Sequence, residues 1–188
     1  MPIEPVAQVP ISPLIEALPK ADVHLHHEER PRLERLVARR QGRPPYDWQR
    51  WARGLVAESG PGHDRLVRLF EPDESLDLSG VRGDDPECVI GKMADVLEEG
   101  AAQEAVLLEV RCGVLSQALS RPDAMSLFRE AERRVQAQWP RLRAEMIGYI
   151  GLSAGPNRLR DAVRQLEACL RMAREGLAGI DFRVDPYD

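Results

Sequence analysis

The stretch of residues 85–111, DPECVIGKMADVLEEGAAQEAVLLEVR, carries the pattern of one helix followed by one strand. Asp85 is in the position of a helix N-cap, Pro86 suits the first helical position, and Gly100 marks the end of the helix. Apolar residues recur between them at helical spacing: Val89, Ile90, Met93, Ala94 and Leu97. The apolar run 105–111 then has the length of a buried strand, so the stretch predicts half of a β–α–β unit.

The same alternation continues on both sides of this stretch. Further strands are predicted at 23–25, 146–152 and 179–183, and a helix is predicted at 123–139. A second helix begins at the N-cap Asn157, ends at Gly176 and has its apolar residues on one stripe: Leu159, Ala162, Val163, Leu166, Leu170 and Ala173. Short apolar strands separated by long amphipathic helices predict an α/β fold with about four parallel strands.

The region before this regular pattern has a different composition. Residues 1–17 include four prolines and no secretion signal, and we predict a flexible leader there, followed by one domain at 18–188. Three helical segments are predicted between the first two strands, at 31–41, 47–58 and 63–70.

The overall composition limits the possible functions. The chain has 188 residues, a net charge of −5 and a pI near 5.5, which argues against nucleic acid as a partner. The sequence has no apolar run of membrane-spanning length. Its three cysteines, an odd number without a C-x-x-C pair, indicate neither a disulfide framework nor a thiolate zinc site, and the expected location is the cytoplasm.

His24 and His26 are the residues that most clearly indicate a site. They are two apart on a predicted strand, so both side chains point to one face. They also lie at the carboxyl end of that strand, where barrel enzymes place their sites. Two imidazoles on one face can share a divalent ion, usually zinc, although a pair of partly buried polar side chains would give the same pattern. His63 is interpreted as a solvated loop residue.

The segment around these histidines resembles a known family. Residues 20–28, KADVHLHHE, are similar to the motif K-x-E-L-H-x-H-L-D-G that opens adenosine deaminases and related amidohydrolases. Residues 98–111, 146–153 and 178–185 resemble the segments around the second, third and fourth strands of that family. The resemblance implies a TIM-type (β/α)8 barrel, which usually needs about 250 residues. We therefore expect this chain to form only the N-terminal half of the barrel.

The resemblance also implies a chemistry. In the family, one zinc ion activates a water molecule that attacks the purine carbon bearing the amino group. His24 and His26 would be two of the zinc ligands, and Glu28 and Asp185 would contact the aminopurine substrate. Several positions depart from the family pattern: Glu29 and Val184 replace glycines, and Pro186 replaces a glutamate.

The remaining family residues leave three hypotheses open. The third histidine ligand, the catalytic glutamate, the second catalytic histidine and the last metal-binding aspartate lie on later strands, so no catalytic residue is assigned here. Zinc would be incompletely ligated, and the isolated chain is expected to be inactive. The chain is part of a zinc-dependent purine nucleoside deaminase, a non-catalytic half-barrel that associates with itself or a complementing C-terminal half, or a different H-x-H metal hydrolase. An ion pair between Glu109 and Arg111 on one strand face is also considered.

Overall fold

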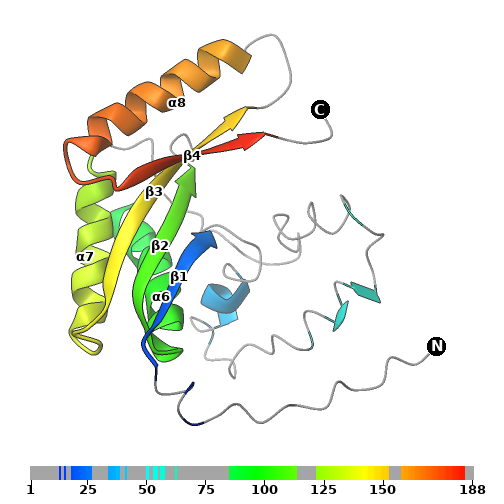
Figure 1. The fold of residues 1–188 in the computed structure, drawn as a ribbon, viewed down its shortest axis with the longest axis vertical. Helices are drawn as coiled ribbons and strands as arrows, with labels where there is room; N and C mark the ends of the chain where they lie inside the picture. The colour runs from blue at the N-terminus through cyan, green and yellow to red at the C-terminus, as the bar shows by residue number, and fades with distance from the viewer. Residues whose placement is uncertain are drawn as a thin grey trace.

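In a computed structural model, the described part of the chain forms a parallel sheet that packs against the long helices α6, α7 and α8 (Figure 1). The residues that the structure describes are 13, 15, 18–26, 34–38, 41, 50, 53–54, 56–57, 62, 85–113, 122–152 and 158–184. The strands are β1 (Lys20–His26), β2 (Ala105–Gly113), β3 (Arg143–Leu152) and β4 (Gly179–Val184). The helices are α6 (Pro86–Ala102), α7 (Ala124–Gln136) and α8 (Arg158–Ala173).

The strands follow one another across the sheet in sequence order. The order is β1-β2-β3-β4, and each neighbouring pair is parallel. Between β2 and β3 the register is regular, with Leu108 opposite Ala144 and Arg111 opposite Ile147. The expected α/β class with four parallel strands is therefore confirmed.

Helix α6 begins as the sequence predicts and ends later. The Asp85 carboxylate accepts a hydrogen bond from the Cys88 amide at 3.0 Å, which makes Asp85 a true N-cap. The helix continues past Gly100 to Ala102, so the prediction that Gly100 ends it is wrong. Gly100 serves close packing instead: a Cβ atom there would lie 2.6 Å from the Leu108 methyl groups.

The core lies between the sheet and the helices α6 and α7. Alternate residues of β2 and β3 point into it, as expected for a sheet with one face covered by helices. These residues are all buried: Leu108, Val110, Cys112, Ala144, Met146 and Ile150. Met93 and Leu97 from α6 and Phe128 from α7 meet them there.

Several boundaries differ from those predicted. Strand β1 includes Lys20, and β3 begins at Arg143 rather than at residue 146, because backbone pairing extends into polar residues that an apolar pattern does not mark. Helix α7 ends at Gln136 rather than Trp139. The Gln136 amide donates a hydrogen bond to the carbonyl of Leu142 at 2.8 Å, which joins the end of the helix to the segment leading into β3.

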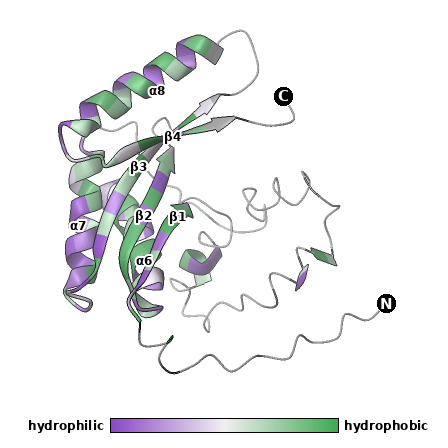
Figure 2. Cartoon of the chain, in the orientation of Figure 1, coloured by the Kyte–Doolittle hydropathy of each residue, from purple (hydrophilic) through white to green (hydrophobic). Residues whose placement is uncertain are grey.

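Helix α8 turns much of its apolar stripe away from the core. Its buried residues are Gln165, Ala168, Cys169 and Met172. Five members of the predicted stripe are exposed instead: Leu159, Val163, Leu166, Leu170 and Ala173. Gln165 is buried because its side-chain amide bonds both backbone groups of Gly151 on β3. An apolar surface thus remains on this helix, seen as the green turns of α8 in Figure 2.

Only part of the predicted N-terminal helices can be compared with the structure. Residues 34–38 of the predicted helix 31–41 are helical, and Arg35 forms ion pairs with Asp95 and Glu99 of α6. The predicted helix 63–70 and most of the leader 1–17 lie outside the described residues, as does most of the predicted helix 47–58.

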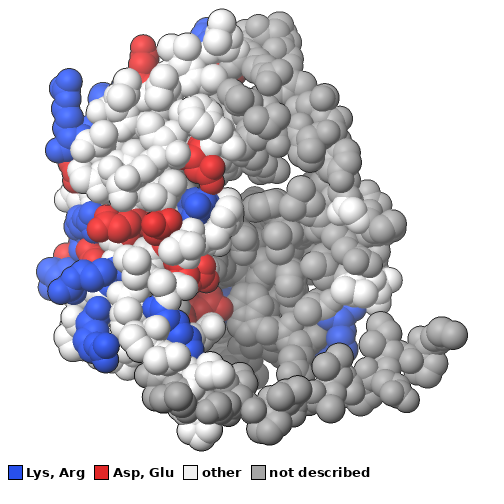
Figure 3. Space-filling view, viewed as in Figure 1, with Lys and Arg blue, Asp and Glu red and all other residues white. Residues whose placement is uncertain are grey.

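The described surface carries charges of both signs. On α7, Arg133 and Arg134 both bond Glu130, and Arg134 also bonds Glu87 of α6. Figure 3 shows acidic and basic side chains lying side by side on one face of the molecule. Within the described part of the chain, none of the helices has the length and apolar character needed to cross a membrane.

Core and stripe positions should respond differently to truncation. Leu108→Ala should lower the free energy of unfolding by about 2–5 kcal/mol, because it removes a fully buried side chain. Leu170→Ala should change it by no more than about 0.5 kcal/mol when unfolding is measured on the dilute monomer, since that side chain is 57% exposed. Urea denaturation of both variants measures the two effects, and equal losses would place Leu170 in the core.

Candidate functional site

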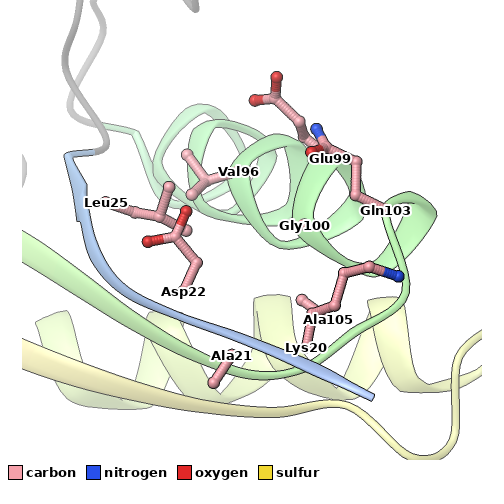
Figure 4. Close-up of a pocket in the computed structure, with 9 residues that line it drawn as sticks. All are labelled: Lys20, Ala21, Asp22, Leu25, Val96, Glu99, Gly100, Gln103 and Ala105. Atoms are coloured by element: carbon pink, nitrogen blue, oxygen red, sulfur yellow. The ribbon is translucent and has the colours of Figure 1, made fainter. Parts of the chain in front are cut away.

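The site is built around an irregularity in β1. Asp22 pairs with Leu108 and Leu25 pairs with Val110, so three steps along β1 face two steps along β2. This is a β-bulge, and it reverses the alternation of side chains. Asp22 and Leu25 both point toward α6, as Figure 4 shows.

His24 and His26, which we call the histidine pair, meet through their ring nitrogens. The two Nε2 atoms are 3.3 Å apart, and the ring centroids are 5.2 Å apart. His26 also makes an edge contact with the ring of Tyr149 on β3, with 6.0 Å between the centroids. The pair therefore lies over the sheet face opposite α6, as expected for two residues on the same face of the strand.

The geometry of the histidine pair fits a shared zinc ion. Two nitrogens bonded to one tetrahedral zinc at about 2.0–2.1 Å lie about 3.3 Å apart, which is the observed separation. Imidazole nitrogen is also a preferred zinc donor. Among the described residues, no group of three or more His, Cys, Asp or Glu side chains is arranged to hold a metal. The pair thus offers two nitrogen donors, and a zinc ion bound there would need at least one more protein ligand.

Arg111 connects both outer strands of the described sheet across this face. Its Nε donates to the carboxylate of Asp181 on β4 at 2.9 Å, and its Nη1 donates to the carbonyl of Val23 on β1. Asp181 is thus an ion-pair partner of Arg111, and no ion pair between described residues joins Arg111 to Glu109, the partner considered from the sequence. Residues 109 and 111 do share a strand face, but the guanidinium reaches across β3 rather than along β2.

The hydrogen bond from Arg111 lowers the pKa of Asp181 below its ordinary value. The positive charge of Arg111 and a smaller contribution from His24 act in the same direction. Asp181 lies beside Tyr149, its register partner on β3. One polar face therefore collects a carboxylate, a guanidinium, a phenol and the histidine pair.

The other residues assigned from the sequence cannot be placed. Glu28, Asp185 and His63 lie outside the described residues. Sequence reasoning missed Tyr149 and Asp181. The available signal was strand alternation on β3, where Tyr149 lies between the buried Gly148 and Ile150, and Asp181 is its register partner on β4.

A cavity of about 370 Å³ lies on the helix side of β1 (Figure 4). Its lining residues come from β1, from α6, from the turn after α6 and from the start of β2: Lys20, Ala21, Asp22, Leu25, Val96, Glu99, Gly100, Gln103 and Ala105. It is separated from the histidine pair by the strand itself.

Comparisons with known proteins relate this fold to one group of enzymes. No protein-family model matches the sequence, and no match exists among curated proteins. Among solved structures, an amidohydrolase from Burkholderia ambifaria with bound zinc is similar, with a TM-score of 0.57 and 17% identity over 97% of this chain. Arabidopsis ADAL complexed with GMP gives a TM-score of 0.58 and 21% identity over 93%. Arabidopsis N6-mAMP deaminase gives a TM-score of 0.58 and 20% sequence identity over 93% of this chain.

These likenesses define the fold. The four parallel strands with their helices form part of a TIM-type α/β barrel, as in amidohydrolase and adenosine-deaminase-like structures. This chain spans about half the length of those proteins, with 50–52% of each covered.

Removing Arg111 should raise the pKa of Asp181. In Arg111→Met, the pKa of Asp181 should rise toward its ordinary value of about 3.9, because its hydrogen bond and neighbouring positive charge are gone. In the unmodified protein the pair stabilises the fold above the unfolded pKa, and this contribution disappears as the pH falls through the lowered folded pKa. Carbon NMR of the carboxyl group during a pH titration measures the change.

Arg129→Met is the matched control for this titration. Arg129 also bonds a carboxylate, that of Glu145, and a backbone carbonyl, that of Ala144. The variant Arg129→Met should leave the pKa of Asp181 unchanged. If Arg111→Met also left the pKa of Asp181 unchanged, the assigned ion pair would be contradicted.

Proposed function

We propose that this chain supplies part of the active site of a zinc-dependent deaminase that acts on an aminopurine nucleoside or nucleotide. The observation that carries the proposal is the histidine pair, whose Nε2 atoms stand at the spacing of two ligands on one tetrahedral zinc. Support comes from the amidohydrolase neighbour with bound zinc, which has the same fold.

The proposed roles divide among a few residues. His24 and His26 hold the metal through Nε2, while Glu28 and Asp185 contact the nucleoside. When bound, zinc supplies Lewis-acid chemistry that lowers the pKa of a water molecule toward neutrality. The substrate class is supported by neighbours solved with GMP and IMP and by one that is an N6-mAMP deaminase.

The site needs residues from outside these four strands. Catalytic zinc sites normally use three protein ligands, and the histidine pair provides two. The proposal therefore includes a complementing C-terminal half or a second copy of this chain. The alternative is a non-catalytic half-barrel that acts through the same association.

The apolar surface near β4 favours such an association. Leu159 and Leu170 on α8 are 77% and 57% exposed, and Phe182 on β4 is 60% exposed. β4 is also an outer strand of the described sheet, and an outer strand can pair with another chain. Apolar side chains gathered beside such an edge are typical of an interface.

We also propose a cytoplasmic location. Cys88, Cys112 and Cys169 are all buried free thiols, which suits a reducing compartment.

Zinc binding and turnover can be tested separately. The purified chain should bind zinc weakly in calorimetry, and His24→Ala should lose that binding, whereas His63→Ala should keep it. Adenosine and AMP should not be deaminated at an ordinary enzymatic rate in a spectrophotometric assay with added zinc, because the chain supplies too few ligands and no assigned general acid. Rapid turnover that is lost in His24→Ala would show that the chain completes its own site, and absence of zinc binding would contradict the proposed metal centre.

The state of association gives an independent test. Light scattering of the 188-residue chain should give a mass above that of one copy, because β4 is an outer strand of the described sheet and carries an exposed apolar side chain. Phe182→Asp should shift the mass toward the monomer, while Gln138→Asp, an equal charge change at an exposed position at the end of α7, should not. A monomeric unmodified chain at high concentration would rule out self-association.

A further inference from the structure

The bulge in β1 leaves backbone groups that the sheet does not pair. A bulge inserts a residue into one strand, so some of its amide and carbonyl groups lose their ladder partners. The ladder between β1 and β2 resumes at Leu25, and the bulged residues are Val23 and His24. Unpaired backbone groups are costly unless another donor or acceptor satisfies them.

Two side chains satisfy these groups. The carboxylate of Asp22 accepts a hydrogen bond from the amide of His24 at 3.1 Å. Nη1 of Arg111 donates to the carbonyl of Val23, the residue before it. The peptide unit that joins Val23 to His24 is therefore held at both its polar atoms, one by a side chain of β1 itself and the other by a side chain of β2.

We propose that Asp22 and Arg111 are positioning residues for the histidine pair, because they fix the peptide unit from which the His24 side chain extends. This inference rests on the proposed zinc site and goes beyond it, since neither residue is a ligand. A rotation of this peptide would move the His24 ring and change the 3.3 Å separation of the two Nε2 atoms.

Arg111 is itself held in place. Its ion pair with Asp181 anchors the guanidinium to β4, and its side chain is only 14% exposed. The position of β1 is thereby tied to the opposite side of the described sheet. Groups that hydrogen-bond the side chain of a metal ligand typically change metal affinity about 10–100-fold when they are removed, and we expect an effect of this order from the two groups that hold the backbone of His24.

The experiment measures zinc affinity of the full chain by competition with a chromophoric chelator. Asp22→Ala and Arg111→Met should each weaken zinc binding about 10–100-fold. Asp22→Asn should restore affinity close to that of the unmodified protein, because the amide oxygen can accept the same hydrogen bond from the backbone. The visible spectrum of bound Co²⁺ should change in Asp22→Ala and Arg111→Met only.

A second measurement needs no metal. Amide hydrogen exchange at His24 should be faster in Asp22→Ala than in the unmodified chain and should return to the slower rate in Asp22→Asn. Asp22 is exposed, so its variants are the least prone to unfolding. They keep the test valid if Arg111→Met does not fold. Arg129→Met controls for the loss of an arginine that bonds a backbone carbonyl elsewhere, and it should leave zinc affinity unchanged.

The outcomes separate this inference from the proposed function. Zinc binding by the unmodified chain that is lost in His24→Ala would support the zinc site. If Asp22→Ala then bound zinc as tightly as the unmodified chain, the positioning role would be wrong although the zinc site would stand. Equal weakening in Asp22→Ala and Asp22→Asn, or in Arg129→Met, would also overturn it. If the unmodified chain binds no zinc at all, the proposed metal centre fails and the positioning role fails with it.

Discussion

The change of register between β1 and β2 controls the polar face of the sheet. Because three residues of β1 span two of β2, Asp22 and Leu25 turn toward α6 while the histidine pair turns away. A regular strand would have put residues 22, 24 and 26 on one face. The bulge thus separates an acidic side chain from the two imidazoles, and each then meets its own set of neighbours: a cavity on the helix side and Tyr149 on the other.

The helix layer supplies the rigid support for this arrangement. α6 approaches β2 so closely that Gly100 has no room for a side chain beside Leu108. β2 in turn carries Arg111 on its opposite face, so the contact with α6 fixes the strand from which the guanidinium extends. Alternation along β2 therefore links core packing on one side to the polar network on the other.

The sequence was sufficient to predict the parallel α/β class and the shared strand face of the histidine pair, because both depend on a local period of two or 3.6 residues. It was not sufficient for the partner of Arg111. Asp181 is 70 residues away, and only the register of three strands brings the two together. The exposure of the apolar face of α8 could not be predicted from the sequence either. The spacing of apolar residues shows which of them share a helix face, but not whether another part of the protein covers that face. The substrate-contact roles of Glu28 and Asp185 remain predictions, because both lie outside the described residues.

The sheet topology has a consequence for the order of folding. The connection between β2 and β3, residues 114–142, has 29 residues, whereas that between β1 and β2, residues 27–104, has 78. The longer connection costs about 0.9 kcal/mol more in loop-closure entropy, so β1 is the strand whose docking is least favoured by chain connectivity. It is also the strand that carries both imidazoles. Loop-closure entropy alone therefore favours pairing of β2 with β3 before β1, and the two imidazoles then join a ladder that is already formed.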